Sequence, residues 1–459
     1  RYVPPVVTPT RAGGFDQKIA IIGAGPAGLS CAFYLAEKGY KPVVFEKNER
    51  PGGMLTYGIP SFKLEKDVIE AEVEVIRLMG AEFRYGVEVG RDVTLDELRE
   101  QGFKAFYVAI GCQGGRLAGI PGEDAEDVTV AVDFLREVNS GKIDALPGRT
   151  IVVGGGNVAI DVARNACRLG SEHVEMFCLE SEAQMPASEE ERREAIEDGA
   201  HISCGWGPKE VHLDETGRVC GITFKRCTRV FDDEGRFAPE YDENDLRRVD
   251  ADRVVMSIGQ SIVWGDLLAG SKVELGRGQG ALADPQTYQT AEPDIFVGGD
   301  VYTGPSFAID AIAAGHEAAV SIHRFVQPGS TLTIGRNQRR YTALDRDDVV
   351  IESYDNASRE AAHVDREREK AAPFSEYVET FTEEQVRAET ARCLGCGASI
   401  VDPNKCIGCG LCTTKCAFDA IHLDRDRPEC STMVKYEQKL PSLGKYALKR
   451  AIKIKFGRK

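Results

Sequence analysis

Short apolar runs alternate along the chain with amphipathic stretches, and glycine-rich turns separate them. Residues 18–22 (KIAII) form such a run, a helical stretch with Ala32, Leu35 and Ala36 on its inner side follows, and residues 42–46 (PVVFE) form a second run. The same order returns over residues 149–180. Strand, helix and strand in this order predict a βαβ unit with parallel strands. The duplicated unit therefore predicts an α/β fold, with helices on both faces of parallel sheets.

Each unit carries glycines at the turn between its first strand and its helix. In the first unit, Gly23 allows a tight turn, Gly25 lets a pyrophosphate approach the backbone, and Gly28 lets helix and strand pack closely. The helix N-terminus offers free N–H groups to the phosphates. Glu46, at the end of the second strand, is placed to accept hydrogen bonds from a ribose diol. A glycine-rich structural turn would not explain this acid, so we predict a dinucleotide site.

Six of the fourteen cysteines lie between residues 393 and 416. They read Cys393-x2-Cys396, and then Cys406-x2-Cys409-x2-Cys412-x3-Cys416. The second group has the spacing of bacterial ferredoxins, in which three thiolates bind one iron–sulfur cluster and the fourth serves a neighbouring cluster. Two CxxC pairs can also bind zinc, but six closely spaced cysteines exceed the need of one zinc ion. The spacing therefore predicts at least one [4Fe–4S] cluster.

A second cluster is an open alternative. Ser399 and Pro403 stand where the third and fourth ligands of the first motif would fall, and the gap between the motifs is short. Cys430 could complete a ligand set. The sequence thus predicts one or two clusters.

Composition narrows the class of partner and the compartment. The chain of 459 residues has a net charge of −16, which argues against binding to nucleic acid. Its apolar runs are too short to span a membrane. Clustered cysteines without an export signal indicate metal binding in the cytoplasm rather than disulfides. The basic stretch at residues 445–459 is either a segment that docks on an acidic partner or a solvated terminus.

Residues 23–64 (GAGPAGLSCAFYLAEKGYKPVVFEKNERPGGMLTYGIPSFKL) resemble the FAD-binding start of the glutamate synthase small subunit family. That group includes the flavin domains of dihydropyrimidine dehydrogenase and of NADH-dependent ferredoxin:NADP oxidoreductases. The resemblance continues through YVAIGC, IPGEDAEDVTVAVDFLREVN, the second glycine loop and DIFVGGDVYTGPSFAIDAIAAGHEAA. It covers residues 15–330 and 373–396, and it implies two Rossmann-like domains.

The resemblance implies that the domain for a nicotinamide cofactor is inserted into the FAD domain, and that a small ferredoxin-like domain follows. The expected parts are an N-terminal extension (1–17), the FAD-binding domain in two pieces (18–148 and 261–330), the NAD(P)-binding domain (149–260), a charged connector (331–390), the iron–sulfur domain (391–430) and a basic tail (431–459).

The family's cofactor contacts carry over residue by residue. For FAD they are Gly23, Gly25, Ala27, Gly28, Glu46, Lys47, Gly53, Leu55, Gly58, Ile59, Pro60, Val89, Gly111, Gly299, Asp300, Ser306 and Ile309. For the nicotinamide cofactor they are Gly154, Gly156, Asn157, Val158, Glu180 and Gly259. Asp161 and Arg164 are expected to brace packing. No catalytic side chain is predicted, because hydride transfer between two cofactors requires alignment rather than an acid or base.

The choice of nicotinamide cofactor should depend on the end of the second strand in the inserted domain. Members of the family that use NADPH commonly carry paired arginines there, which bind a 2′-phosphate. Alignment on the shared MPA at 185–187 puts Leu179 and Glu180 at those places. A carboxylate suits a ribose diol, so we predict NAD(H) over NADP(H). In the alternative, Glu180 only ends the strand and Arg192 or Arg193 holds the phosphate.

These features predict a flavin–iron–sulfur oxidoreductase subunit. NAD(H), FAD and the cluster would exchange electrons with another subunit or a ferredoxin in a hetero-oligomer, and electron bifurcation stays open. One alternative is a glutamate synthase small subunit that uses NADPH, although that group usually carries its clusters before the FAD unit. The other is a relay or assembly subunit without turnover. Disulfide reduction is not expected, because Cys112 stands alone near the flavin loops.

Overall fold

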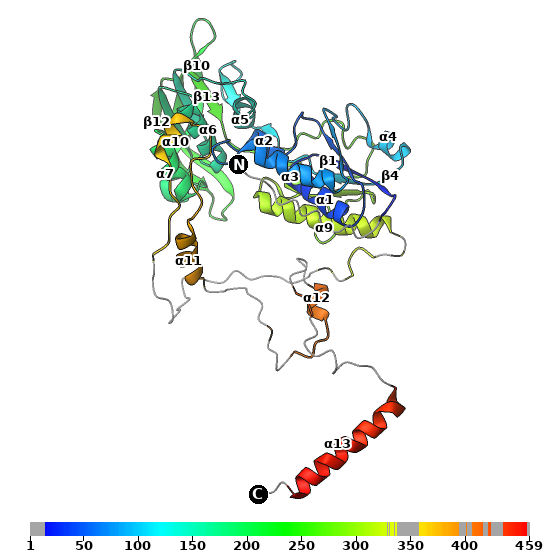
Figure 1. Cartoon of the computed structure of the whole chain (residues 1–459). Helices are drawn as coiled ribbons and strands as arrows, with labels where there is room; N and C mark the ends of the chain where they lie inside the picture. The colour runs from blue at the N-terminus through cyan, green and yellow to red at the C-terminus, as the bar shows by residue number, and fades with distance from the viewer. Residues whose placement is uncertain are drawn as a thin grey trace. The chain divides into compact units, whose positions relative to one another are not determined.

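The structure is a computed structural model, and it describes residues 14–327, 329, 331–334, 336, 358–393, 401, 406–415, 421–423 and 435–456. These residues fall into two compact units, each described here by itself (Figure 1). The first unit comprises Arg1–Ile351 and Ala361–Phe381, and the second comprises Glu352–Glu360 and Thr382–Lys459.

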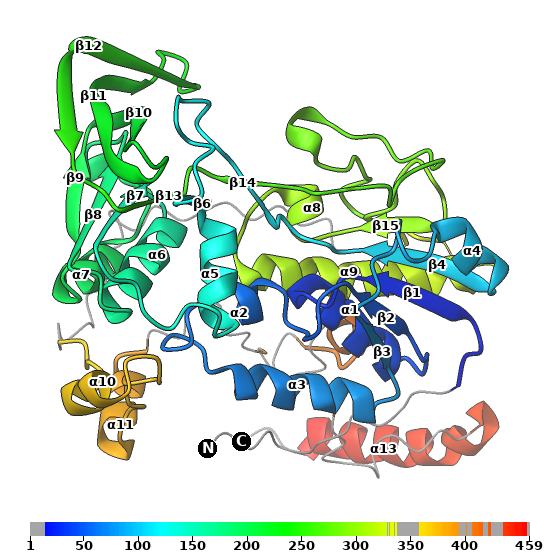
Figure 2. The same cartoon turned by 90° about the horizontal axis from the view of Figure 1, so that it is seen from above.

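The first sheet of the larger unit has five parallel strands in the order β15-β4-β1-β2-β3. Alternate residues of a strand point to opposite faces. Ile19 and Ile21 therefore belong to an apolar cluster with residues of α1 and α9, whereas Ala20 and Ile22 belong to a cluster on the other face with Leu267 and its neighbours. Figure 2 shows α1 and α9 side by side next to this sheet. The strands are β1 (Lys18–Ile22), β2 (Val43–Glu46), β3 (Glu82–Tyr85), β4 (Phe103–Val108) and β15 (Ile295–Val297), and the helices are α1 (Pro26–Glu37), α2 (Met54–Tyr57), α3 (Lys66–Leu78), α4 (Leu95–Glu100), α8 (Asp300–Thr303) and α9 (Ala308–Val326).

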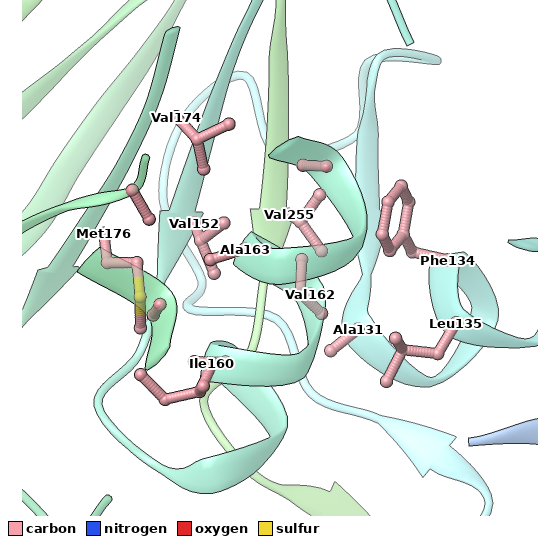
Figure 3. Packing of buried hydrophobic residues seen from close by; sticks show 14 of the residues in the cluster. Ala131, Phe134, Leu135, Val152, Ile160, Val162, Ala163, Val174, Met176 and Val255 are labelled. Carbon is pink, nitrogen blue, oxygen red and sulfur yellow. The ribbon is translucent and has the colours of Figure 1, made fainter. Parts of the chain in front are cut away.

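The second sheet is also parallel, in the order β6-β13-β7-β8-β9. Figure 3 shows Val152, Val174, Met176 and Val255 of this sheet beneath the helices α5 and α6. Its strands are β6 (Val128–Val130), β13 (Arg253–Met256), β7 (Arg149–Val153), β8 (His173–Cys178) and β9 (His201–Cys204), and its helices are α5 (Ala131–Asn139), α6 (Asn157–Arg168) and α7 (Glu189–Glu197).

The other face of the second sheet is covered by an antiparallel sheet, so the prediction of helices on both faces is wrong here. Phe177 of β8 stacks on Phe224 at 3.9 Å between ring centroids. The covering strands are β10 (Trp206–Leu213), β11 (Val219–Phe231) and β12 (Phe237–Val249). A sheet that buries apolar side chains on one face can replace a helix layer.

The chain crosses between the two parallel sheets through a two-stranded ribbon. β5 (Gly114–Gly115) pairs with β14 (Gln260–Ser261), and β6 then joins the second sheet beside β13. The second sheet thus begins with β6, before residue 149, at which we expected the NAD(P)-binding domain to begin. Two short 3-10 helices, η1 (Glu182–Gln184) and η2 (Arg277–Gln279), complete this part of the unit.

Residues 361–381, which we call the strap, belong to the larger unit and pack against its helix α6, so they are more than a connector. The strap contains α10 (Arg366–Ala371). Arg168 of α6 donates to the carbonyl oxygen of Pro373 at 2.7 Å, and Arg164 donates to the Tyr377 hydroxyl at 2.6 Å. These residues fall within the expected connector 331–390, and their contacts are mainly ionic or polar.

The smaller unit carries three helices within the described residues. They are α11 (Glu383–Ala391), α12 (Leu411–Lys415) and α13 (Tyr436–Phe456). α11 begins with a capping box, in which the Thr382 side chain accepts from Gln385 N–H and the Gln385 side chain accepts from Thr382 N–H. Among the described residues, no helix is long and apolar enough to cross a bilayer.

Candidate functional site

The first glycine loop connects β1 to α1. Gly23 has φ of +104°, and a β-carbon there would overlap the carbonyl oxygen of Ala109. A β-carbon at Gly28 would overlap the carbonyl oxygen of Gly23. Gly25 is the N-cap residue of α1, so the free N–H groups of that helix face the loop. Glycine at these positions therefore permits the turn and the close contact of helix and strand.

Glu46 lies at the carboxyl end of β2, against this loop. Its side chain is 3% exposed, its Oε2 accepts from Ala24 N–H at 2.8 Å, and its Oε1 accepts from Asn48 N–H at 2.9 Å. The Asn48 side-chain amide also donates to Oε1, at 2.6 Å. These bonds hold the carboxylate beside the glycine loop, where a ribose diol would bind.

A cavity extends from the first glycine loop along the carboxyl ends of the first sheet. The cavity is also lined by Leu135 of α5 and by Val158 and Asp161 of α6, two helices that pack on the second parallel sheet. The predicted FAD residues that line it are Gly23, Gly25, Ala27, Glu46, Lys47, Gly53, Leu55, Gly58, Ile59, Val89, Gly111, Gly299, Asp300 and Ser306. The glycine backbone and small side chains of this wall, next to the buried carboxylate of Glu46, fit an FAD.

Three predicted FAD residues do not line the cavity. Gly28 lies under the loop, in contact with Gly23, and Pro60 lies just beyond the lining residue Ile59. Ile309 is 67% exposed, because the buried face of α9 is formed by residues such as Ala311, Ala314 and Ala318. A helical spacing places residue 309 outside that stripe.

Sequence reasoning missed several residues of the cavity wall. Some continue predicted motifs, and others come from elements without a recognisable motif, such as the segment after β14. The additional lining residues are Ile22, Pro26, Phe45, Met54, Val87, Glu88, Ala109, Ile110, Gln113, Leu135, Asp161, Gln260, Val263, Trp264, Leu267, Gly298, Pro305, Phe307, Ala308 and Ala311.

The start of α9 also faces the cavity. The helix begins at Ala308, and Ser306, Phe307 and Ala311 line the wall with it. Burial raises the pKa of Asp300, while a hydrogen bond from the Ser306 backbone opposes that shift. A half-buried carboxyl group next to a helix N-terminus is suited to bind hydroxyl groups of a cofactor chain.

The second glycine loop repeats the first with one difference. Gly154 has φ of +143°, and α6 begins at Asn157 after the N-cap residue Gly156. Glu180 Oε2 lies 3.1 Å from the place that a β-carbon of Gly155 would occupy. In the first unit, Ala24 and Glu46 occupy the positions that correspond to Gly155 and Glu180. In the described part of the chain, however, no donor lies within hydrogen-bond distance of the Glu180 carboxylate.

The other predicted nicotinamide residues lie around this loop. Val158 reaches the cavity, whereas Gly154, Gly156, Asn157, Glu180 and Gly259 lie outside its wall. Arg192 donates to the carbonyl oxygen of Glu182 at 2.7 Å, and Arg193 pairs with Glu197 at 3.7 Å on the same helix.

Asp161 and Lys63 form an ion pair in the wall where the cavity meets α6. Lys63 Nζ lies 2.6 Å from Asp161 Oδ1 and also contacts Glu191. Burial raises the pKa of Asp161 to about 6, against the opposing effect of Lys63. Burial lowers the pKa of Lys66 to about 8, and its ammonium group donates to the Leu55 carbonyl oxygen at 2.8 Å.

Arg164, one turn further along α6, has a different environment. Its side chain is 1% exposed and pairs with Asp198 at 2.8 Å and with Glu194. Its contacts join α6, α7 and the strap, which is the arrangement expected of a packing brace. Arg164 is absent from the cavity wall.

Four of the six predicted cluster ligands are described, and Cys393, Cys406, Cys409 and Cys412 are all exposed. Among the described residues no three candidate ligands lie close enough to hold a metal ion. Cys396 and Cys416, together with Ser399, Pro403 and Cys430, lie outside the described residues. The thiol donors and their spacing still suit an iron–sulfur cluster, which binds through cysteine thiolates.

Cys112 is a buried thiol beside the flavin cavity. It is 2% exposed, it donates to the Asp300 carbonyl oxygen at 3.6 Å, and burial raises its pKa to about 12. A thiol with so high a pKa is a poor nucleophile at neutral pH. This environment suits a small packing residue.

A glycine loop at the start of each of α1 and α6, with a cavity that runs from the first loop to Val158 of α6, indicates a flavoprotein that binds two dinucleotides. A family model described as "Pyridine nucleotide-disulphide oxidoreductase" matches residues 17–315, and the chain belongs to this family. A second model, "4Fe-4S binding domain", matches residues 399–422. The expected FAD, nicotinamide cofactor and [4Fe–4S] cluster are thereby confirmed as the chain's cofactor classes.

Curated relatives confirm the resemblance found in the sequence. The NADP(+)-dependent formate dehydrogenase subunit beta of Moorella thermoacetica is 36% identical over 406 residues, which are 84% of this chain and 55% of the relative. The glutamate synthase [NADPH] small chain of Escherichia coli K12 is 36% identical over 330 residues, 68% of this chain and 69% of the relative. The NAD-dependent dihydropyrimidine dehydrogenase subunit PreT of Escherichia coli K12 is 34% identical over 311 residues, 68% of each.

The chain spans about half the length of the formate dehydrogenase subunit and of the putative oxidoreductase AegA of Escherichia coli K12, to which it is 37% identical over 325 residues. Among solved structures, FprA from Mycobacterium tuberculosis superposes with a TM-score of 0.58 at 19% identity, covering 68% of this chain and 84% of FprA. Lactococcus lactis thioredoxin reductase superposes with a TM-score of 0.53 at 19% identity, covering 68% of this chain and 99% of the other. These likenesses show that the fold is that of FAD and NAD(P) oxidoreductases.

Proposed function

We propose that this chain is the electron-transfer subunit of a complex, in which it passes electrons between NAD(H), FAD and one or two [4Fe–4S] clusters. The observation that carries the proposal is the cavity that leads from the first glycine loop to Val158 and Asp161 of α6. A wall shared by both nucleotide-binding folds allows a flavin and a nicotinamide to meet. Such alignment of two bound reactants is the main contribution of a protein to hydride transfer.

Different residues would bind different parts of the two cofactors. Glu46 and the first glycine loop would hold the adenosine and pyrophosphate of FAD, and Asp300 with the start of α9 would hold its other end. The second glycine loop and α6 would hold the nicotinamide cofactor. FAD, when bound, accepts two electrons from a nicotinamide and can release them singly, which suits transfer to iron–sulfur clusters.

We infer NAD(H) as the cofactor from the environment of Glu180. Its Oε2 lies against Gly155, as the Glu46 carboxylate lies against Ala24 in the first unit. A 2′-phosphate at this place would meet a carboxylate charge. Arg192 and Arg193, the alternative phosphate ligands, already contact Glu182 and Glu197. The curated relatives include proteins named for each of the two cofactors, so this finer choice is a proposal.

Anaerobic titration of the protein with NADH and with NADPH tests this assignment. We expect NADH to bleach the flavin absorbance at concentrations at least about 10-fold lower than NADPH, because only NADPH must bring a phosphate next to Glu180. Glu180→Ser should reduce this preference, and Glu182→Ser, two residues further along the chain in η1, should leave it unchanged. Bleaching by NADPH alone would contradict the choice of NAD(H) and favour a glutamate synthase-type small subunit.

Two further functions are distinguished by the same titration. A glutamate synthase small subunit would use NADPH and pass electrons to an amidotransferase partner. A relay or assembly subunit would hold its cofactors without reacting with either nicotinamide. The intact second glycine loop and the cavity at Val158 favour a reactive subunit over the relay.

We propose a partner subunit or a ferredoxin as the other end of the electron path. Curated relatives are named as subunits, among them formate dehydrogenase subunit beta. α13 supports a docking role, because its described side chains are exposed and include Leu443, Leu448 and Ile454 beside several lysines. A hetero-oligomer in the cytoplasm, without nucleic acid, agrees with the acidic charge and the clustered thiols.

A further inference from the structure

The segment Tyr57–Lys66 belongs to the FAD-binding part of the chain but inserts between elements of the second domain. We call it the inner loop. Asn139 of α5 donates to the carbonyl oxygens of Tyr57 at 3.2 Å and of Gly58 at 3.3 Å. Phe62 is 2% exposed, and the guanidinium of Arg168 lies 4.2 Å from its ring centroid. The second domain therefore holds this loop from several sides.

One end of the inner loop forms the flavin side of the cavity. Gly58 and Ile59 line the wall, as does Leu55 just before the loop. Lys66 Nζ donates to the carbonyl oxygens of Leu55 at 2.8 Å and of Ile59 at 2.5 Å. The position of the inner loop thus determines the shape of the flavin site.

Lys63 connects this loop to the nicotinamide side. Its ammonium group lies 2.6 Å from Asp161 Oδ1 on α6 and also contacts Glu191 on α7. Asp161 differs from Glu191 in that it lines the cavity, together with Val158 of the first turn of α6. Asp161 is consequently the one partner of Lys63 that faces the place where the two cofactors would meet.

We propose that Asp161 is a positioning residue for hydride transfer: by holding Lys63, it fixes the inner loop and aligns the flavin wall with the nicotinamide face of α6. This inference rests on the proposed function and states how the same site aligns its two cofactors. Asp161 acts through Lys63 and needs no proton transfer of its own. The expected consequence is that loss of the carboxylate disturbs alignment more than folding.

The energetics of the pair support a role other than stability. A buried ion pair often stabilises a protein no better than apolar residues would, because both charges lose their hydration. Burial raises the pKa of Asp161 to about 6 from an ordinary 3.8, although Lys63 and Arg164 favour its charged form and Glu191 opposes it. The stability that accompanies a raised carboxyl pKa is lost as the pH rises through about 6. At pH 7 the burial of the ionised Asp161 therefore opposes folding. Burial also works against the charged form of Lys63, but its contacts with Asp161 and Glu191 raise its pKa and favour folding, so the net contribution of the pair to stability is small.

Asp161→Asn in the full-length protein tests the proposal. We expect the limiting rate of flavin bleaching by NADH to fall about 10-fold or more, with the dissociation constant of NADH changed less than about 2-fold, because orientation and not binding is lost. FAD should bind about 5-fold more weakly to flavin-stripped protein, because the inner loop is less well organised. The melting temperature at pH 7 should not fall.

Glu194→Gln is the matched control. Glu194 pairs with Arg164 across the same two helices but does not line the cavity. We expect this variant to melt at a lower temperature and to retain the parent bleaching rate. Lys63→Met should reproduce the kinetic loss of Asp161→Asn, and the double variant should be no slower than either single variant, because both changes remove one interaction.

Either of two results would overturn the proposal. One is an Asp161→Asn protein with the parent bleaching rate, and the other is a slower protein whose melting temperature falls as far as that of Glu194→Gln. If the parent protein reacts with neither nicotinamide, the proposed function fails by itself. In that case FAD affinity decides the present question, since unchanged affinity in Asp161→Asn would exclude an organising role for the pair.

Discussion

Replacing Gly23 by alanine is expected to give a protein that no longer retains FAD. Two effects combine at this residue. Its φ of +104° lies in the left-handed region, which costs an alanine about 1–2 kcal/mol. The new β-carbon would also overlap the carbonyl oxygen of Ala109, a backbone atom at the end of β4 that cannot turn away. The turn must therefore open, and the N–H groups of α1 lose their place opposite the pyrophosphate.

The measurement is the ratio of flavin to protein after purification, followed by FAD titration of stripped protein. Gly102→Ala is the matched control, because Gly102 has φ of +92° but nothing within 4 Å of its missing β-carbon. We expect this control to lose about 1–2 kcal/mol of stability and to keep its flavin. A Gly23→Ala protein that is yellow and fully loaded would show that the loop can relax, and that our account of its tightness is incorrect.

Replacing Cys409 by serine should separate the two halves of electron transfer. Cys409 is the second cysteine of the ferredoxin-type spacing, and a serine oxygen is a poor substitute for a thiolate on iron. The flavin and nicotinamide sites lie in the other compact unit and should be unaffected. We therefore expect NADH to bleach the flavin as in the parent, with loss of the EPR signal of the cluster that Cys409 binds and of electron transfer to a ferredoxin.

Cys220→Ser on β11 controls for the removal of a thiol, because Cys220 lies outside the ferredoxin spacing. It should keep the parent cluster signal. Analysis of iron, sulfide and zinc in both variants checks the nature of the bound group. Zinc in the parent without iron would contradict the cluster assignment, and a cluster signal that survives in Cys409→Ser would remove this residue from the ligand set.

The sequence predicted the parts of the site in which chemistry depends on a local pattern. The glycines of both loops and the acids Glu46 and Glu180 were found because a turn, a helix start and a strand end are adjacent in the chain. In the structure the glycines lie between β1 and α1 and between β7 and α6, and Glu46 ends β2, while their role in binding stays a prediction. Where several predicted contacts came from the family's pattern alone, the cavity includes most of them but not Pro60 or Ile309.

Long-range parts of the site could not be read in this way. Lys63 and Asp161 are 98 residues apart in the chain, and only the packing of α6 against the inner loop brings them together. Trp264 reaches the cavity from the segment after β14, which carries no recognisable motif. Contacts of this kind arise from tertiary packing, which a single sequence does not encode as a local pattern.

The fold shows the same limit at the strap and at β12. The strap binds α6 mainly through polar contacts, such as Glu369 to Arg168 at 2.7 Å, so it lacks the apolar periodicity of a packed element. β12 is mostly exposed, and its residues EYDENDLRR show no alternation of apolar and polar positions. Charged sequences of this kind resemble connectors, although their backbone here pairs or packs.

The difference between Glu46 and Glu180 bears on how long each nucleotide stays. The Glu46 carboxylate is already oriented by Ala24 and Asn48, so a ribose that bound it would meet an acceptor held in place in the cavity wall. The Glu180 carboxylate accepts no such hydrogen bonds among the described residues, so a ribose that bound it would also have to order it. A cofactor that remains through many cycles needs the first kind of site, and one drawn from a shared cellular pool needs the second. The two units of the duplication are therefore expected to differ in residence time, with FAD held long at Glu46 and the nicotinamide cofactor exchanging readily at Glu180.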